Sequence, residues 1–463
     1  MRDGALWQAA TMQSNDRGTE VGDRLASCVS DDVSDAALDD AVAHAHRRYA
    51  ARRTRSRELA DEARRWLPGG NTRSVLDFAP FPFRVAAVDG PYLVDVDGHR
   101  YLDLLGNYTA GLLGHRPAET ERVLKEAAET GVSVGAMTSV ETDAARLICE
   151  RYASIEQVRI TNSGTEANLM AISTMRHHTG RSKVIACRGA YHGGLLYFGD
   201  GGAGLLAPYD WVLADFNDTA SVEDVFAAHG ASIAGVIVEP MLGAAGCIPP
   251  EPGFLETVRR LCSANSSLLV FDEVMTSRLA LGGAQELLDV VPDMTTLGKY
   301  VAGGFNFGAF GGNAEIMGAY DPSRGGALSH SGTFNNNPLT IAGVAATLGF
   351  TLTEELLARV NGLGDRLRRR LSEIFASVDV PLSVTGLGSM MNIHGTERTP
   401  RTVDDVAVGD DRWKALLFFH LLEAGFYIAR RGFISLSADI AEAHVDAFAD
   451  AVAAWAAEPT VVA

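Results

Sequence analysis

The middle of this 463-residue chain alternates short β-rich runs with helical segments, and this alternation limits the possible folds more than any other feature. Several of the runs are continuously apolar, as parallel strands are when helices cover both faces of their sheet. A strand, a helix and a second strand in repeating order predict an α/β domain with a largely parallel sheet. The runs span residues 157–161, 183–187, 233–239 and 268–272.

The rhythm changes near residue 350, where helical stripes of apolar residues and short strand-like runs replace the alternation. We predict a smaller α+β domain here, formed by residues 351–463 and joined in space by an N-terminal helix and hairpin at residues 34–105. Residues 106–350 form the predicted large domain. Residues 1–33 are polar with little periodicity, so we expect a mobile N-terminal arm.

Charge and cysteine usage exclude several classes of protein. The chain carries 40 Lys and Arg against 58 Asp and Glu, a net charge of -18. Nucleic acids and anionic lipids are bound by basic patches, so we expect neither as a partner. The five cysteines are scattered without a C-x-x-C pair, which predicts a reduced compartment, no disulfide framework and no metal site. No apolar run approaches ~18 residues and no signal peptide is evident, so we expect a cytoplasmic protein without a membrane span.

Lys299 is the first candidate for a chemical role. It follows Leu297-Gly298 and precedes a glycine-rich stretch that continues to Gly312. Burial lowers the pKa of a lysine, and the neutral amine is then nucleophilic and able to form a Schiff base. Taken alone, a lysine in such a place is more often exposed beside a loop.

Three further segments carry groups that a cofactor needs. Asp272 ends an apolar strand, and a carboxylate buried there requires a cationic partner such as a protonated pyridine nitrogen. Asn162-Ser163-Gly164-Thr165-Glu166 lies between a strand and a helix, where free N–H groups and both hydroxyls can bind a phosphate dianion. Tyr191-His192-Gly193 follows the next strand and can place an aromatic ring flat on a heteroaromatic cofactor. Each segment also has a structural interpretation, as an ion pair, a helix cap or an ordinary turn.

Taken together, the four segments meet the four needs of pyridoxal 5′-phosphate (PLP). The cofactor requires a phosphate site, a cover for its ring, a carboxylate that keeps the ring nitrogen protonated, and an amine that binds its aldehyde. The sequence therefore predicts PLP as the cofactor.

From about Leu67 to Ser437 the chain resembles the class III, fold-type I aminotransferases. Residues 92–103 are similar to the family hairpin, 162–166 to its phosphate turn, 272–274 to its aspartate strand and 296–299 to its lysine segment. The resemblance implies a large domain with a mostly parallel, seven-stranded sheet. It also implies that Thr333, in Ser331-Gly332-Thr333, reaches the phosphate of a neighbouring subunit, which would make the protein a homodimer with shared active sites.

Within this class the chain is most similar to the glutamate-1-semialdehyde aminomutase group and, inside that group, to β-amino-acid (β-phenylalanine-type) aminotransferases. Residues 68–75, 107–111, 275–278 and 332–337 follow the pattern of the latter, and Asn306 replaces a proline typical of aminomutases. Other class III transaminases carry a glutamate in E-P-x-x-G-E that neutralises a substrate-binding arginine. Here Ala244 occupies that place, so this gating is not expected.

The resemblance also suggests a substrate site. Arg73 matches the β-aminotransferase arginine that faces the active site, and Arg431 matches one near the entrance, although the adjacent Arg430 leaves open which of the two points inward. Tyr108, Met241 and Ala244 complete the predicted substrate site. The predicted cofactor site consists of Ser163, Gly164, Thr165, Tyr191, His192, Asp272, Lys299 and Thr333.

The predicted function is a PLP-dependent aminotransferase that moves the amino group of an aromatic or apolar β-amino acid to 2-oxoglutarate or pyruvate. Lys299 would bind the cofactor as a Schiff base and then carry the substrate proton, while Asp272 would keep the ring nitrogen protonated. Two alternatives stay open: an aminomutase or racemase on the same core, and a non-catalytic PLP-fold binding protein. The intact lysine, aspartate and phosphate turn favour the enzyme.

Overall fold

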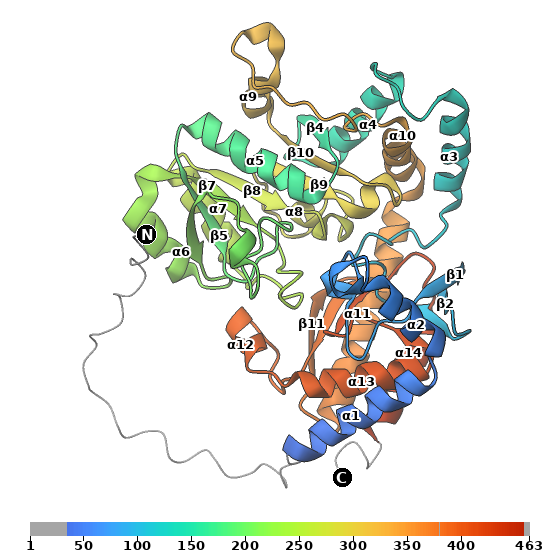
Figure 1. Cartoon of the computed structure of the whole chain (residues 1–463). Coiled ribbons are helices and arrows are strands. Elements are labelled where there is room, and N and C mark those ends of the chain that lie inside the picture. Colours follow the sequence, from blue (N-terminus) through green and yellow to red (C-terminus); the bar gives the residue numbers. More distant parts are fainter. Residues whose placement is uncertain (1–34, 379, 458–463) are drawn as a thin grey trace, which may run out of the picture.

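A computed structural model describes residues 35–378 and 380–457 as a large and a small domain (Figure 1). The predicted mobile arm, residues 1–33, lies outside the described residues. In Figure 1 the large domain fills the upper half, while the blue N-terminal and the orange-to-red C-terminal segments share the lower half.

The large domain is built on a seven-stranded sheet in the order β4-β10-β9-β8-β7-β5-β6. Strand β10 runs antiparallel to β4 and β9, and the other neighbours are parallel, so the predicted mostly parallel sheet is confirmed. The four predicted β-rich runs form β4, β5, β7 and β8, with β7 ending at Val238. The strands are β4 (Gln157–Thr161), β5 (Lys183–Cys187), β6 (Asp210–Ala214), β7 (Ile233–Val238), β8 (Leu268–Asp272), β9 (Met294–Gly298) and β10 (Gly308–Gly312).

Successive residues of these strands pack against helices on opposite faces of the sheet. Val184 and Ala186 of β5 share a core with helix α5 (Gly164–Thr179), whereas Ile185 and Cys187 share one with α6 (Thr219–His229) and α7 (Phe254–Ala264). Because both faces are covered, apolar residues occur at consecutive positions and not at every second one. The remaining helices of this domain are α3 (Ala118–Thr130), α4 (Ser139–Arg151), α8 (Ala284–Leu287), α9 (Ala314–Met317) and α10 (Pro338–Ala346).

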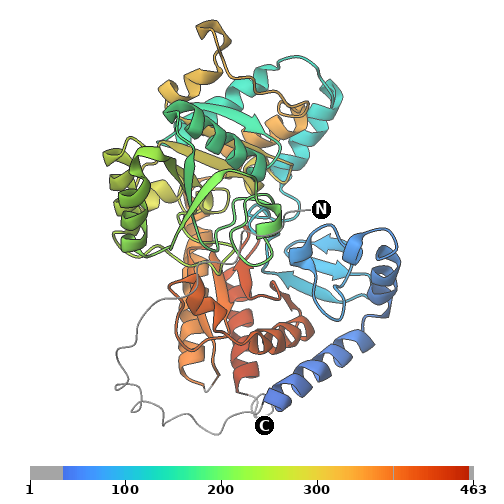
Figure 2. The same ribbon diagram turned by 60° about the vertical axis from the view of Figure 1, so that its left-hand side comes forward.

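The small domain combines segments from both ends of the described chain. Strand β13 (Phe426–Tyr427) pairs in parallel with β3 (Arg100–Asp103), so the N-terminal hairpin lies against the C-terminal segment in both ribbon views (Figure 2). The other strands are β1 (Val85–Asp89), β2 (Tyr92–Asp95), β11 (Ser383–Leu387), β12 (Met390–His394) and β14 (Phe433–Ser435). The helices are α1 (Asp35–Ala51), α2 (Thr54–Ala63), α11 (Glu354–Ala376), α12 (Val403–Ala407), α13 (Asp411–Glu423) and α14 (Glu442–Ala456).

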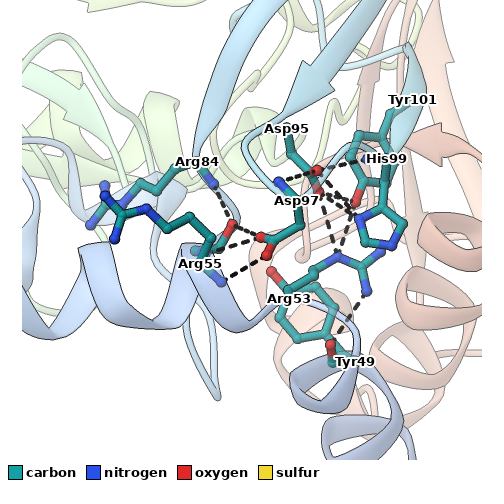
Figure 3. A network of polar contacts seen from close by, with 9 residues as sticks. Tyr49, Arg53, Arg55, Arg84, Asp95, Asp97, His99 and Tyr101 are labelled. Atoms are coloured by element: carbon teal, nitrogen blue, oxygen red, sulfur yellow. Dashed lines mark hydrogen bonds and ion pairs between the residues drawn. The ribbon is translucent and has the colours of Figure 1, made fainter.

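A polar network fixes the start of α2 on the β2–β3 hairpin (Figure 3). Asp97, in the turn of that hairpin, accepts hydrogen bonds from the backbone N–H groups of Arg55 and Ser56, at 2.7 and 3.0 Å. These are first-turn groups that the helix itself cannot satisfy, and its own N-cap residue, Arg53, supplies no side-chain acceptor. The buried Arg53 instead donates to the Tyr101 hydroxyl at 2.9 Å. The hairpin therefore caps the helix.

Among residues 35–378 and 380–457, no single helix is long and apolar enough to cross a membrane. One pair, Pro338–Thr351 and Glu354–Ala376, passes the length and composition test when taken together, with a bend of 83° between its members.

Candidate active site

A cavity of about 360 Å³ opens where β4, β5, β7, β8 and β9 end. In a parallel sheet the carboxyl ends of the strands meet at one edge, which is where α/β proteins place their ligands. The cavity brings together seven of the predicted site residues: Ser163, Gly164, Thr165, Tyr191, His192, Asp272 and Lys299.

Lys299 directly follows β9 and projects into this cavity from a strained backbone. Its φ is +53°, a left-handed conformation that residues other than glycine rarely adopt. The pKa of Lys299 is lowered to about 8. Burial is the largest cause, Asp272 and Glu239 oppose it, and the cations Arg431 and Arg73 add to it. The amine is therefore a better nucleophile at neutral pH than an exposed lysine.

The predicted phosphate turn forms the N-terminus of α5. Ser163 is the N-cap residue, and its hydroxyl oxygen accepts a hydrogen bond from the Glu166 N–H at 3.1 Å. Ser163 therefore caps the helix, and its hydroxyl hydrogen stays free to donate to a ligand. Gly164 packs so closely on Val274 that a Cβ atom there would collide with the valine side chain. Gly164 and Thr165 line the cavity at the start of α5, where the helix dipole favours an anion.

Asp272 is held by three donors. Its Oδ2 accepts from Asn168 Nδ2 at 2.8 Å and lies 2.8 Å from His192 Nδ1, and its Oδ1 accepts from the Val274 N–H at 3.0 Å. We assign the imidazole proton to Nδ1, since an ionised carboxylate only accepts. The Thr296 hydroxyl in turn donates to Asn168 Oδ1 at 2.6 Å. The carboxylate is thus fixed in orientation at the cavity wall.

Tyr191 and Glu239 form another side of the cavity. The Tyr191 side chain is 43% exposed, so a ring face is available to a ligand. Its backbone N–H donates at 2.9 Å to Glu239, which also accepts from the Gly243 N–H at 3.0 Å. Glu239 is almost fully buried, and burial raises its pKa to about 7.

The two candidate substrate arginines contact one aromatic ring. The guanidinium carbon of Arg73 lies 5.8 Å from the Tyr108 ring centroid, and that of Arg431 lies 5.1 Å from it. Arg73 donates to Asn107 Oδ1 at 2.6 Å, and Arg431 donates to the Ala244 carbonyl at 2.8 Å. Both acceptors are neutral, so these bonds leave the charge of each arginine uncompensated.

Arg430 and Arg431 point to different surroundings. Arg430 interacts electrostatically with Asp411 and with His46 of α1, and its burial lowers its pKa. Arg431 lies beside the cavity, and its Nε is buried without a hydrogen-bond partner among the described residues. Arg431 is therefore the member of the pair that is available to a ligand at this site.

Six predicted residues lie outside the lining of this cavity: Arg73, Tyr108, Met241, Ala244, Arg431 and Thr333. Arg73 lines a neighbouring cavity. Met241 is fully buried in an apolar cluster with Tyr108 and Cys247. Thr333 is exposed, on a loop that Asn335 ties to the phosphate turn through a hydrogen bond from Asn162 at 2.9 Å.

Sequence reasoning missed Asn107, Asn168 and Glu239. Glu239 follows an apolar strand in the same way as Asp272, so the rule that found Asp272 would also have found it. Asn168 lies within a helix and carries no such signal. Asn107 lies within a motif that was recognised, but nothing in the sequence marks its side chain.

The residues fit PLP. The N–H groups and hydroxyls of the α5 turn suit the phosphate, Asp272 suits a protonated pyridine nitrogen, and Lys299 suits the aldehyde. The buried His192 Nε2 has no hydrogen-bond partner within the described part of the chain. No group of three or more His, Cys, Asp or Glu side chains there could hold a metal ion.

Comparisons with known proteins agree with this assignment. A family model of class III aminotransferases matches residues 77–198 and 207–445. A β-phenylalanine transaminase of Variovorax paradoxus is 44% identical over 423 residues, which cover 91% of this chain and 97% of that protein. A crystal structure of a β-phenylalanine aminotransferase from the same organism aligns with a TM-score of 0.88 over 90% of this chain and 97% of that one, at 44% identity.

Two further relatives bear on the chemistry. A glutamate-1-semialdehyde 2,1-aminomutase of Methanothrix thermoacetophila is 37% identical over 83% of this chain and 92% of its own length. A transaminase solved with PLP bound is 31% identical, with a TM-score of 0.79 over 87% of this chain and 97% of that chain.

Proposed function

The chain belongs to the class III aminotransferases, which depend on PLP, and on that premise we propose that its amino donor is a β-amino acid with an aromatic or apolar substituent and its acceptor 2-oxoglutarate or pyruvate. The observation that carries this proposal is the pair of arginines on the Tyr108 ring, each held by a neutral oxygen. The name of the Variovorax paradoxus relative supports the same substrate class.

The arginines are needed because the protein as a whole repels carboxylates. The net charge is -18, and both the amino donor and the keto acid carry negative charge. A guanidinium group matches the two oxygens of a carboxylate and remains charged at every working pH. Relative to an α-amino acid, a β-amino acid has its carboxylate one carbon further from the reacting amine. Two cations beside one ring offer two candidate positions for this carboxylate.

Bound PLP supplies an electron sink for the electrons released at the amine-bearing carbon. The N-terminal turn of α5 would hold the phosphate, and the Asp272 carboxylate, oriented by His192 and Asn168, would keep a proton on the ring nitrogen. Lys299 Nζ would bind the aldehyde, and the same amine would serve as the base for the proton on the carbon that bears the donor amine. With a pKa of about 8, roughly a tenth of such amines are neutral at pH 7.

A donor panel tests the proposal. We expect 3-amino-3-phenylpropanoate to be a better donor than its α-isomer with 2-oxoglutarate or pyruvate, judged by kcat/KM. A clear preference for the α-isomer would defeat the proposal. An aminomutase or racemase would regenerate its starting cofactor form with the donor alone, whereas an aminotransferase accumulates the pyridoxamine form. A protein that takes up PLP but reacts with no donor would favour the non-catalytic alternative.

We also propose that the protein is a homodimer with shared sites. Thr333 lies outside the cavity of its own subunit, next to Phe334, whose side chain is 62% exposed. Asn336 of the same loop donates to the Ala136 carbonyl at 3.2 Å, which brings the loop close to Met137, 93% exposed. Exposed apolar residues gathered in this way are typical of subunit interfaces.

We further propose a cytoplasmic location. The four described cysteines, Cys149, Cys187, Cys247 and Cys262, are all free thiols, as in proteins of a reducing compartment.

A further inference from the structure

A left-handed turn lies at the edge of the active site. Gly106, Asn107, Tyr108 and Thr109 follow one another with φ values of 53°, 47°, 52° and 76°. Three of the four carry side chains, and Thr109 is β-branched, which makes this conformation costly. Four consecutive residues keep this left-handed backbone conformation only where the surrounding structure holds them in place.

The surroundings of the turn are tight. Asp103 Oδ1 accepts from the N–H groups of Leu105 and Gly106, at 2.9 and 3.1 Å. The Ser435 carbonyl approaches so closely that a Cβ atom at Gly106 would collide with it. The turn is therefore fixed by groups from both the N-terminal hairpin and the C-terminal segment.

This conformation directs two neighbouring side chains at residues 68–75, the segment that carries Arg73 and is called the Arg73 segment below. Asn107 Oδ1 accepts from Arg73 Nη1 at 2.6 Å, and the Tyr108 hydroxyl donates to the Val75 carbonyl at 2.8 Å. Asn107 lines both the Lys299 cavity and a neighbouring cavity of about 460 Å³, which Arg73 lines. Asn107 thus lies at the boundary between the reacting amine and the candidate carboxylate site.

We propose that Asn107 is a positioning residue that fixes the Arg73 guanidinium for the substrate carboxylate, an inference that rests on the proposed function. An amide oxygen holds the guanidinium through one N–H and leaves the other donors and the full positive charge available. A carboxylate at this position would hold Arg73 equally well but would cancel its charge. The Ala244 carbonyl holds Arg431 in the same neutral way.

The base of the Arg73 segment has a separate anchor, so loss of the Asn107 amide should not unfold it. Arg84 Nη2 donates to the Gly70 carbonyl at 2.9 Å, and the Arg84 N–H donates to the Ser56 hydroxyl within the network of Figure 3. Asn107 acts on the tip of the segment alone.

The test uses Asn107→Gly, which removes the amide and keeps a backbone that tolerates positive φ. The probe is 3-phenylpropanoate, which has a carboxylate but no amine to react, titrated into the holoenzyme by calorimetry. We expect its Kd to rise about tenfold, as for a lost hydrogen bond to a charged group. Asn107→Asp should weaken binding at least as much although it keeps the acceptor, because it neutralises Arg73. For the β-amino donor, KM should rise more than kcat falls.

Two controls separate positioning from general damage. Asn217→Gly makes the same substitution at another left-handed asparagine, φ 67°, whose amide bonds the Pro249 and Arg401 carbonyls. It should lower the Tm and leave the Kd unchanged. In the amine half-reaction, followed without keto acid, the Asn107 variants should lose more kcat/KM with the β-amino donor than with 1-phenylethylamine, which lacks the carboxylate; where 1-phenylethylamine does not react, calorimetry alone decides.

An unchanged Kd in Asn107→Gly, or wild-type affinity in Asn107→Asp, would overturn the role of Asn107. An equal loss with 1-phenylethylamine and the β-amino donor would also overturn it. A parent enzyme that neither binds 3-phenylpropanoate nor uses the β-amino donor would instead overturn the proposed function, and the inference with it.

Discussion

Glu239→Gln provides a quantitative test of the raised pKa of Glu239, a carboxyl group that lines the candidate active site. Glu239 is buried, and its carboxylate accepts only two backbone N–H groups, those of Tyr191 and Gly243. Burial raises its pKa from 4.5 to about 7. The folded chain therefore binds a proton at Glu239 more tightly than the unfolded chain does.

The sign of the effect on stability follows from this difference. The contribution of Glu239 to the free energy of unfolding is fully present below pH 4.5, where the folded and the unfolded chain are both protonated. It is lost as the pH rises through 7. A difference of 2.5 pKa units corresponds to about 3 kcal/mol of unfolding free energy. Between pH 6 and 8.5, a range above the pI of about 5.1, about 1.4 kcal/mol of this should be lost.

Glutamine has nearly the same volume and does not titrate. Its amide offers one acceptor oxygen, so one of the two backbone N–H groups loses its partner at a fixed cost of about 1–3 kcal/mol. Urea unfolding of the cofactor-free parent and variant, followed by tryptophan fluorescence, gives the difference between their unfolding free energies at each pH. Other titrating groups contribute equally to both proteins and cancel in this difference. The parent should be the more stable protein at pH 6, and its advantage over Glu239→Gln should shrink by about 1.4 kcal/mol by pH 8.5.

A difference that stays constant across this pH range would refute the raised pKa. An infrared band of protonated carboxyl groups that is weaker at pH 6 in Glu239→Gln than in the parent would give the same answer without unfolding; Glu273 should contribute to the rest of the band. Glu273→Gln is a second test, because burial also raises the pKa of Glu273 to about 7.

Four further outcomes follow from the proposed site. Lys299→Ala should lose the visible absorption band of the lysine-bound cofactor and all turnover, and a borohydride-reducible linkage in this variant would contradict the role of Lys299. Asp272→Ala should retain some PLP through its phosphate but lose most activity, and near-normal turnover would make Asp272 purely structural. Arg73→Ala should lower kcat/KM in both half-reactions by an amount that corresponds to about 2 kcal/mol of lost transition-state stabilisation. This is the lower end for a charge pair, because Arg73 is exposed. Unchanged kcat/KM values for both carboxylate substrates would reject the role of Arg73. A mixture of Lys299→Ala and Thr333→Ala subunits should be more active than either variant alone, since one of the two sites of the heterodimer is intact. No gain in activity after verified subunit exchange would count against shared sites.

The sequence predicted the centre of the large domain because its strands carry a strong signal. Strands β5, β7 and β8 are apolar at consecutive positions and are covered on both faces. Strand β6 has exposed residues at the edge of the sheet and lacks this signal. Strand β10, Gly-Ala-Phe-Gly-Gly, reads as part of a glycine-rich loop. Its glycines are required by close backbone contacts, since a Cβ atom at Gly308 would collide with the Ser163 carbonyl.

The residues that line the candidate cofactor site could be proposed from the sequence, but the groups that orient them could not. Asp272 and Lys299 stand at strand ends, where sequence position alone places a side chain at the ligand-binding edge. Asn168 orients Asp272 from the middle of α5, and its role depends on how the helix packs across the strand ends. The backbone of Asn107 is set by contacts from distant parts of the chain, so its link to Arg73 is visible only in three dimensions.

Under the proposed function, the two arginines reconcile an acidic protein with acidic substrates. An arginine at the edge of a cavity needs hydrogen-bond partners to keep a defined position, and a carboxylate would be the strongest one. A carboxylate would also compete with the substrate for the same charge. Asn107 and the Ala244 carbonyl provide position without charge, and Tyr108 lies against both guanidinium groups through its ring face. Ala244 lacks the side-chain carboxylate that a glutamate would place here, and its backbone oxygen holds Arg431 without cancelling its charge, which under the proposed function stays available to the substrate.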